Sequence, residues 1–205
     1  MRYWTSPLLI LLAFSAYSVL HSILASRGAK EWARQHFGAG ITSRTYRLFY
    51  NMVGVVTLLP VLALVLWLPD QSFYTTPPVL QPLLLAGQVL GLLLLAAALA
   101  QTDALDFAGL RQLADQASEP QLVTGGAYRW MRHPLYTGSM LVLWLLPSLS
   151  MNWFAFILGI SLYFIIGATF EERRLEVFFG QAYRDYKART PMFIPWPRRA
   201  IGSKK

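Results

Sequence analysis

Two groups of charged and aromatic residues in the last third of the chain have types and spacing that could do chemistry. The first is a cationic turn, residues 129–138 (RWMRHPLYTG). The second is the carboxylate pair Glu171-Glu172, which is followed by Tyr183 and Tyr186. Apolar stretches separate the two groups, so they stand at the feet of a hydrophobic hairpin. Charges are costly to hold at a lipid boundary, which makes this pair of groups the candidate functional site.

Pro134 decides the local geometry of the cationic turn. The residue before a proline is pushed out of the helical region, so His133 is expected to end one segment. Pro134 suits the first turn of a new helix, whose free N–H groups and dipole favour an anion. Arg129 and Arg132 lie just before this helix start. The turn therefore predicts an anion-binding helix N-terminus, although Arg and Trp at a membrane boundary also serve simply to anchor helices.

The carboxylate pair is expected to face the cationic turn, because a hairpin returns the chain to the same side of the membrane. Glu172 and Glu176 are four residues apart and share one helix face, as do Tyr183 and Tyr186 at a spacing of three. The alternative is that the arginines beside Glu172 merely neutralise the carboxylates at the interface. Taken together, the two groups suit a zwitterionic, partly aromatic cofactor opposite a lipid-like substrate.

Composition places these groups in a membrane protein. Of 205 residues, 55% are hydrophobic and 14% are charged, whereas a soluble domain carries about 25% charged residues. The absence of cysteine excludes disulfides, thiolate zinc sites and a cysteine nucleophile. The three histidines lie in different segments, so no metal site is expected. The net charge of +8 comes without a recognition motif, so nucleic-acid binding is not expected either.

Hydropathy predicts about five membrane spans. A spanning helix needs about 20 mostly apolar residues. Four stretches qualify, and a fifth, Leu135 to Leu149, is short. The four are Pro7 to Ala25, Leu48 to Leu68, Val79 to Ala100, and Asn152 to Phe170. An uncharged turn at residues 148–152 would join the short span to the last one. The predicted fold is an all-α polytopic membrane protein whose last two spans form a hairpin before a cytoplasmic C-terminal helical tail.

Charge predicts the orientation of the spans. Lys and Arg gather in residues 26–47, 101–134 and the tail after Phe170, while residues 69–78 and 148–152 contain none. Since basic segments stay inside, the N-terminus is expected outside the membrane and the C-terminus in the cytoplasm. Of the ten acidic residues, all but Asp70 fall on the cytoplasmic side. We therefore expect the active site there.

The chain is expected to form one integral-membrane domain over residues 1–205. Residues 1–100 would be a three-span scaffold on the acceptor side, and residues 101–205 would supply the connector, hairpin and tail that bind the cofactor. In the scaffold, His21 and Asn51 are the polar candidates for acceptor contact, and helix packing is the favoured interpretation of both.

The motifs resemble those of the integral-membrane methyltransferases of the isoprenylcysteine carboxyl methyltransferase and phospholipid methyltransferase group. The resemblance covers roughly residues 122–195. It depends on residues 122–129 (LVTGGAYR), on 132–138 (RHPLYTG), and on Glu171-Glu172 with the later Phe179-Gly180, Tyr183 and Tyr186. The N-terminal half is more similar to the bacterial branch with NnrU-like and methanethiol S-methyltransferase-like proteins.

This resemblance implies S-adenosylmethionine as methyl donor, in a cytoplasm-facing pocket made by the last hairpin and tail. His133 and Tyr136 would contact the methionine end with Arg132 nearby, and residues 122–128 would lie along the adenosine. Glu171 or Glu172 would hold polar groups of the cofactor or orient the acceptor. The implied catalytic residues are Arg132, Glu171 and Glu172. The implied cofactor-binding residues are Leu122, Val123, Tyr128, Arg129, His133, Pro134, Tyr136, Gly138, Glu172 and Tyr183.

The predicted function is methyl transfer to a small or lipid-soluble acceptor, which is a carboxylate, a thiol or an amine. Membrane lipids are expected partners, and the sequence does not indicate an oligomeric state. One alternative is a non-enzymatic membrane accessory protein with the same fold. A small transporter is disfavoured, because the spans lack ionisable residues at mid-membrane depth.

Overall fold

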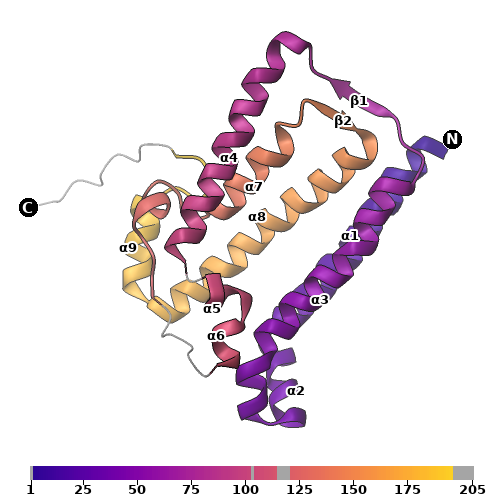
Figure 1. The fold of residues 1–205 in the computed structure, drawn as a ribbon. Coiled ribbons are helices and arrows are strands. Elements are labelled where there is room, and N and C mark those ends of the chain that lie inside the picture. Colours follow the sequence, from indigo (N-terminus) through magenta and orange to yellow (C-terminus); the bar gives the residue numbers. More distant parts are fainter. Residues whose placement is uncertain (1, 103, 115–120, 196–205) are drawn as a thin grey trace, which may run out of the picture. The chain divides into compact units, whose positions relative to one another are not determined.

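The structure is a computed structural model that describes residues 2–102, 104–114 and 121–195. Helices make up most of it, with one short strand pair (Figure 1). In chain order the elements are α1 (Arg2–Ala25), α2 (Arg27–Phe37), α3 (Ala39–Trp67), β1 (Ser72–Thr75), η1 (Pro78–Leu80), α4 (Gln81–Gln101), α5 (Ala104–Ala108), α6 (Leu110–Leu113), η2 (Gly126–Arg129), α7 (Pro134–Trp144), β2 (Ser148–Ser150), α8 (Met151–Phe179) and α9 (Gln181–Arg189).

Four helical segments are long and apolar enough to cross a membrane: Trp4–Ala25, Ala39–Trp67, Pro78–Gln101 and Met151–Phe179. They confirm the predicted all-α polytopic membrane fold. The short span expected at residues 135–149 forms the 11-residue helix α7. At 1.5 Å per residue this helix is about 16 Å long, roughly half the hydrocarbon core of a bilayer. The count of five spans therefore stays a prediction.

The prediction of an uncharged turn at residues 148–152 was wrong in detail. Ser148–Ser150 forms β2, which pairs antiparallel with β1, and α8 already begins at Met151. The strands are only three and four residues long, which is too short for an alternation of apolar and polar residues to identify them. The pairing depends on contacts far along the chain, so the local pattern could not predict it.

Asp70 and Asn152 hold this strand pair in place. One carboxylate oxygen of Asp70 accepts hydrogen bonds from the backbone N–H groups of Asn152 at 3.0 Å and Gln71 at 2.8 Å. The fully buried Asn152 amide donates to the carbonyls at the end of α3, Val65 at 3.4 Å and Leu68 at 3.2 Å. The one acidic residue on the predicted outer side thus has a structural role.

The chain divides into two compact units assembled from separate segments. The first unit contains residues 1–76, 103–119 and 148–163, and the second contains residues 77–102, 120–147 and 164–205. Helix α8 contributes its first part to one unit and its second part to the other. The expected single domain, with its functional division near residue 100, stays a prediction.

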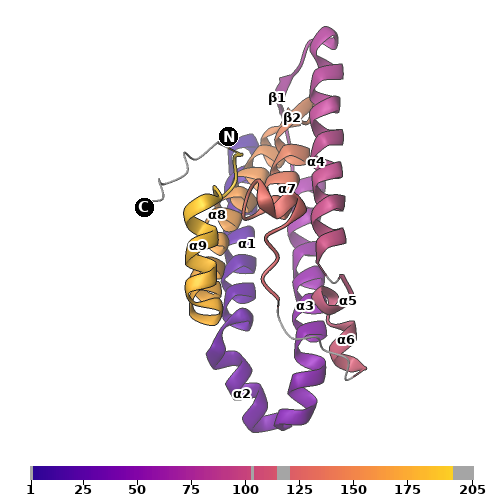
Figure 2. The same cartoon turned by 90° about the vertical axis from the view of Figure 1, so that its left-hand side faces the viewer.

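Apolar packing builds the first unit. Helices α1 and α3 lie side by side along their length (Figure 2). The ring of Phe14 is buried and meets Phe156 of α8 edge-on, with centroids 5.7 Å apart. A Cβ at Gly159 would stand 2.9 Å from the Phe14 ring, so this glycine admits the aromatic side chain between the helices.

Close backbone contact builds the second unit, where α7 packs on α4. A Cβ on Gly138 would lie 2.8 Å from the Gly91 carbonyl, and a Cβ on Gly91 would lie 2.9 Å from the Gly138 carbonyl. Small residues at such crossings let helices approach closely in lipid. The side chain of Gln88 adds a hydrogen bond to the Val142 carbonyl at 2.9 Å. This crossing positions the N-terminal end of α7, which belongs to the cationic turn.

Candidate active site

The backbone of the cationic turn is hydrogen-bonded to the tail that follows α9. His133 is the N-cap residue of α7 and has non-helical backbone angles, as the proline after it predicts. The N–H groups of Arg132 and His133 donate to the carbonyls of Pro191 at 2.9 Å and Met192 at 3.1 Å. The hydroxyl of Thr137 donates to the next carbonyl along the tail, that of Phe193, at 3.0 Å. The tail therefore holds the turn in one conformation.

Arg132 and Glu172 form a buried ion pair. Nε of Arg132 donates to Oε1 of Glu172 at 2.6 Å, and both side chains are only 5% exposed. The same guanidinium donates to the backbone carbonyls of Lys187 at 3.2 Å and of Thr190. Each of these bonds ties together segments more than 35 residues apart in the chain, so the pair organises α8, α9 and the turn at once.

His133 lies between the two predicted glutamates. Its Nε2 is 3.3 Å from Oε1 of Glu172, and its Nδ1 is 3.7 Å from Oε2 of Glu171. The imidazole stacks on the ring of Tyr136, with centroids 5.3 Å apart and planes 2° from parallel. Tyr136 in turn stacks on Phe164 at 4.8 Å. The structure thus brings together the turn and the carboxylate pair, as the hairpin argument predicted.

The two glutamates have different surroundings. Glu172 is buried, whereas the side chain of Glu171 is 43% exposed. Glu171 accepts a hydrogen bond from the hydroxyl of Tyr136 at 2.9 Å. Glu172 instead receives Arg132 on one oxygen and a second cation on the other. A carboxylate held between cations is a poor proton acceptor, so the exposed Glu171 is the better candidate for contact with a reacting group.

The second cation is Lys187, which the sequence reasoning missed. Its Nζ lies 3.0 Å from Oε2 of Glu172 and 2.6 Å from Oε1 of Glu176. The hydrogen bonds that the Lys187 ammonium donates to Glu176 and Glu172 raise the pKa of Lys187. A signal was available, because Lys187 follows Tyr183 by four residues and so shares its helix face.

Three tyrosines lie near the charged groups: Tyr183 and Tyr186 are buried, and Tyr128 is half-buried. The hydroxyl of Tyr186 donates to the carbonyl of Tyr128 at 2.6 Å. Burial raises the pKa of Tyr186 to about 12, and burial together with the charge of Glu171 raises that of Tyr128 to about 12. Tyr183 is 1% exposed, and burial raises its pKa as well. Within the described residues its hydroxyl has no hydrogen-bond partner, so it is a buried donor still to be used.

The other predicted site residues have varied positions. Leu122 and Val123 are half-buried in the irregular stretch before η2, and Arg129 is exposed. Pro134 is fully buried at the start of α7. Gly138 lies against α4, so helix packing alone accounts for it. Their predicted roles toward a cofactor stay predictions.

Gln101 occupies the space beside Gly126, in the glycine pair at residues 125–126. The side-chain oxygen of Gln101 accepts a hydrogen bond from the N–H of Ala127 at 3.0 Å. A Cβ on Gly126 would lie 2.1 Å from that oxygen. This contact fixes the start of η2, and the sequence analysis did not single out Gln101.

The two polar candidates of the scaffold have local partners in the first unit. The Nε2 atom of His21 lies 2.5 Å from the hydroxyl of Tyr50. The amide of Asn51 donates to the carbonyl of Ala108 at 2.9 Å and so holds α5 on α3. Both contacts agree with the favoured packing interpretation. In the part of the chain that the structure describes, no cluster of three potential metal ligands occurs.

The second unit therefore presents cations, a histidine, an exposed carboxylate and an unused phenol around one helix N-terminus. Cations and the helix start can hold a carboxylate, while Glu171 can hold an ammonium group or take a proton. This set suits a zwitterion.

Comparison with known proteins places the chain in a family. Residues 9–197 match the family described as NnrU protein. Methanethiol S-methyltransferase 1 of Bradyrhizobium diazoefficiens is 29% identical over 197 residues, which cover 92% of this chain and 66% of that protein. Methanethiol S-methyltransferase of Pseudomonas deceptionensis is 30% identical over 208 residues, which cover 98% of this chain and 77% of the relative.

A plant protein matches over a shorter stretch. Protein-S-isoprenylcysteine O-methyltransferase B of Arabidopsis thaliana is 33% identical over 81 residues, which cover 37% of this chain and 40% of that protein. No solved structure matches the chain. The relatives confirm the resemblance to the membrane methyltransferase group that the sequence motifs indicated. The chain spans only 66% of the length of the first bacterial relative.

Proposed function

This chain belongs to the NnrU protein family, within the group of integral-membrane methyltransferases, and we propose that it transfers a methyl group from S-adenosylmethionine to a small or lipid-soluble acceptor. The observation that carries the proposal is the contact between the cationic turn and the carboxylate pair. Arg132 and His133 meet Glu172, and Tyr136 meets Glu171, across 35 to 40 residues of chain.

The residues of the site fit the polar end of S-adenosylmethionine, which carries an amine and a carboxylate. The buried hydroxyl of Tyr183 is a donor without a partner among the described residues, and a carboxylate needs such donors. The guanidinium of Arg132 and the imidazole of His133 contact the same oxygen of Glu172, Oε1. We propose that these three groups hold the donor's carboxylate, while residues 122–128 lie along its adenosine.

When bound, S-adenosylmethionine supplies a methyl group already activated on a sulfonium. The protein has mainly to position the acceptor in line and to exclude water. The stack of His133, Tyr136 and Phe164 gives a rigid aromatic wall for this purpose. Glu172 fixes Arg132, and Glu171, oriented by the Tyr136 hydroxyl, takes the proton that a thiol or amine acceptor must lose.

A thiol is the acceptor class we favour. The two bacterial relatives described above are named methanethiol S-methyltransferases. A thiolate is a strong nucleophile, so it needs little beyond removal of its proton. A carboxylate or an amine remains the alternative within the same site.

We propose five spans with the N-terminus outside and the C-terminus and active site in the cytoplasm. The basic segment at residues 26–47, which follows α1, and the basic tail after Phe170 support this orientation. Reporter fusions after Arg47, Thr75 and Trp196 should read inside, outside and inside. A fusion after Thr75 that reads on the same side as one after Arg47 would reject it.

Cofactor binding and turnover test the proposed function directly. The purified protein in detergent should be stabilised against heat by excess S-adenosylmethionine or its demethylated product, through binding linkage. Radiolabelled methyl transfer to methanethiol and longer alkyl thiols should then place label in the volatile or organic fraction. His133→Ala should abolish both effects, whereas His36→Ala, at an exposed position of α2, should retain them.

The alternative is a membrane accessory protein that keeps this fold without catalysis. It predicts that neither stabilisation nor transfer occurs in any of several detergents and in lipid nanodiscs. That result would remove the enzyme proposal.

A further inference from the structure

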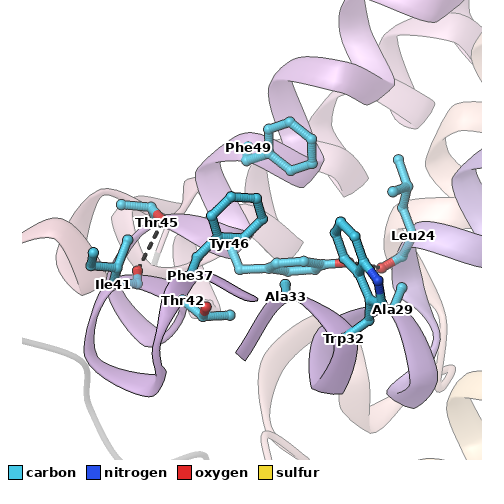
Figure 3. Close-up of a pocket in the computed structure, with 10 residues that line it drawn as sticks. All are labelled: Leu24, Ala29, Trp32, Ala33, Phe37, Ile41, Thr42, Thr45, Tyr46 and Phe49. Carbon is cyan, nitrogen blue, oxygen red and sulfur yellow. Dashed lines mark hydrogen bonds between the residues drawn. The ribbon is translucent and has the colours of Figure 1, made fainter. Parts of the chain in front are cut away.

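An apolar chamber of about 610 Å³ lies between α2 and α3 in the first unit. Figure 3 shows its lining, which includes Leu24 from α1, Ala33 and Phe37 from α2, and Tyr46 and Phe49 from α3. Its volume falls within the range of about 300–1,000 Å³ that is usual for small-molecule sites. Nothing in the proposed methyl transfer uses this chamber.

The hydroxyl groups of the lining are all engaged with the backbone. Tyr46 donates to the carbonyl of Leu24 at 2.7 Å. Thr42 donates to Gly38 and Thr45 to Ile41, each at 2.9 Å, so both bonds lie within the helical segment itself. A ligand inside the chamber finds almost only carbon, and the part of it that enters must be hydrocarbon.

Helix α2 carries cations beside the chamber. Arg27, Lys30 and Arg34 follow one another at spacings of three and four and so share one helix face, while Ala29, Ala33 and Phe37 line the chamber from another. Helix α2 itself contains these three cations and one acidic residue, Glu31, which lies 3.7 Å from Arg34 in an exposed pair. Exposed pairs are weak, so this face keeps an attraction for anions.

An apolar face and a basic face on one short helix are typical of a helix that lies in the membrane interface. We propose that the chamber binds an acyl chain of an anionic phospholipid, whose phosphate lies against the cationic face formed by Arg27, Lys30 and Arg34. The complementarity of charge selects an anionic headgroup over a zwitterionic one. The predominantly apolar lining selects the acyl chain.

The proposal can be tested with two lipids that differ only in headgroup. The protein is reconstituted in vesicles that contain a trace of phosphatidylglycerol or phosphatidylcholine, each with a diazirine in one acyl chain. After irradiation, labelled residues are mapped by mass spectrometry. Phosphatidylglycerol should label the lining residues of α2 and α3 at least about fivefold more than phosphatidylcholine, because each cation near an anionic lipid contributes roughly that factor.

Three variants test separately the contributions of the acyl chain and of the lipid headgroup to binding. Ala33→Trp fills the chamber and should remove labelling of its lining by both lipids. Lys30→Gln combined with Arg34→Gln should lower labelling by phosphatidylglycerol about fivefold or more and leave phosphatidylcholine unchanged. Arg173→Gln combined with Arg174→Gln removes the same charge from α8 and should have no effect on the lining.

Two results would overturn the proposal. In the first, both lipids label the lining equally, which removes the headgroup preference. In the second, an alkyl thiol suppresses the labelling, which makes the chamber an acceptor site. Because no step requires methyl transfer, a protein inactive toward every acceptor would still give the expected labelling.

Discussion

The histidines of the two units have opposite surroundings. In the first unit, His21 stacks on Tyr17 at 5.6 Å and on Tyr50 at 4.3 Å, and its Nε2 atom meets the Tyr50 hydroxyl. In the second unit, His133 lies within 4 Å of two glutamate side chains. One imidazole is surrounded by neutral rings, and the other belongs to a network of charges.

This difference separates packing from chemistry. Neutral hydrogen bonds and ring stacks suit helix association in lipid, where ions are costly. Buried ion pairs add little net stability, so their presence in the second unit indicates a different purpose. Under the proposed function, the charges hold side chains in fixed positions for a polar ligand. The experiments below disturb one unit or the other and ask whether stability and ligand binding respond together.

The largest effect is expected from Arg132→Ala. It leaves the 5%-exposed Glu172 without its main partner and frees two backbone carbonyls. Breaking a buried pair from one side costs about 3–5 kcal/mol. Thermal unfolding in detergent should show this loss. The matched control, Arg184→Ala, removes an arginine whose bond to Gln181 is exposed, and its cost should stay within about 0.5 kcal/mol.

The two glutamates should separate stability from turnover. Glu172→Gln removes the charge that Arg132 and Lys187 share, and should cost about 2–4 kcal/mol and weaken cofactor binding. Glu171→Gln changes a side chain that is 43% exposed, so unfolding should change little. Its main effect should be a fall in kcat of about 100-fold, typical of a lost general base. Equal losses of stability in both variants would contradict the division between them.

The sequence predicted the parts of this site that local rules control. Pro134 set the start of α7 and placed His133 at its N-cap. The expected hairpin predicted that Glu171 and Glu172 lie near the cationic turn. Hydropathy located the four long spans, because apolar composition alone fixes them.

The parts it missed depend on contacts between distant segments. Lys187 contacts Glu172 on a different helix. The helix face that Lys187 shares with Tyr183 could have placed it near the site, but it does not identify Glu172 as the partner. The strand pair β1–β2 and the bond of Gln101 to Ala127 are of the same kind. The contrast between Glu171 and Glu172 was also out of reach, because adjacent residues of one helix differ here only in their burial.

A smaller effect is expected in the first unit from Gly54→Ala. A Cβ there would lie 2.8 Å from Cε1 of His21, so the imidazole must leave its stack. Overpacking of this kind costs about 1–3 kcal/mol. Gly40→Ala, in the same helix but with open space around it, should be neutral or slightly stabilising. Affinity for S-adenosylmethionine, measured by calorimetry, should be the same in both variants. A selective loss in Gly54→Ala would show that the packing unit also shapes the site.

The smallest change in stability is expected from removing one tyrosine hydroxyl. At Tyr183 and at Tyr186 this change should have opposite signs. The Tyr183 hydroxyl is buried and has no partner among the described residues, while that of Tyr186 donates to the Tyr128 carbonyl at 2.6 Å. Tyr183→Phe should therefore raise the free energy of unfolding by about 1 kcal/mol, and Tyr186→Phe should lower it by a similar amount.

Affinity and pH dependence complete this last test. If the Tyr183 hydroxyl donates to the bound cofactor, Tyr183→Phe should weaken S-adenosylmethionine binding by about 3- to 10-fold while the unliganded protein becomes more stable. The raised pKa of Tyr183 keeps it protonated in the folded chain at pH values where an unfolded tyrosine, with a pKa of about 10, has ionised. The unfolded state then binds fewer protons, so stability should fall as pH rises above about 10, and the fall should be less steep in Tyr183→Phe. Unchanged affinity in that variant would show that the Tyr183 hydroxyl does not contact the cofactor. It would then be a polar group of the packing, like His21.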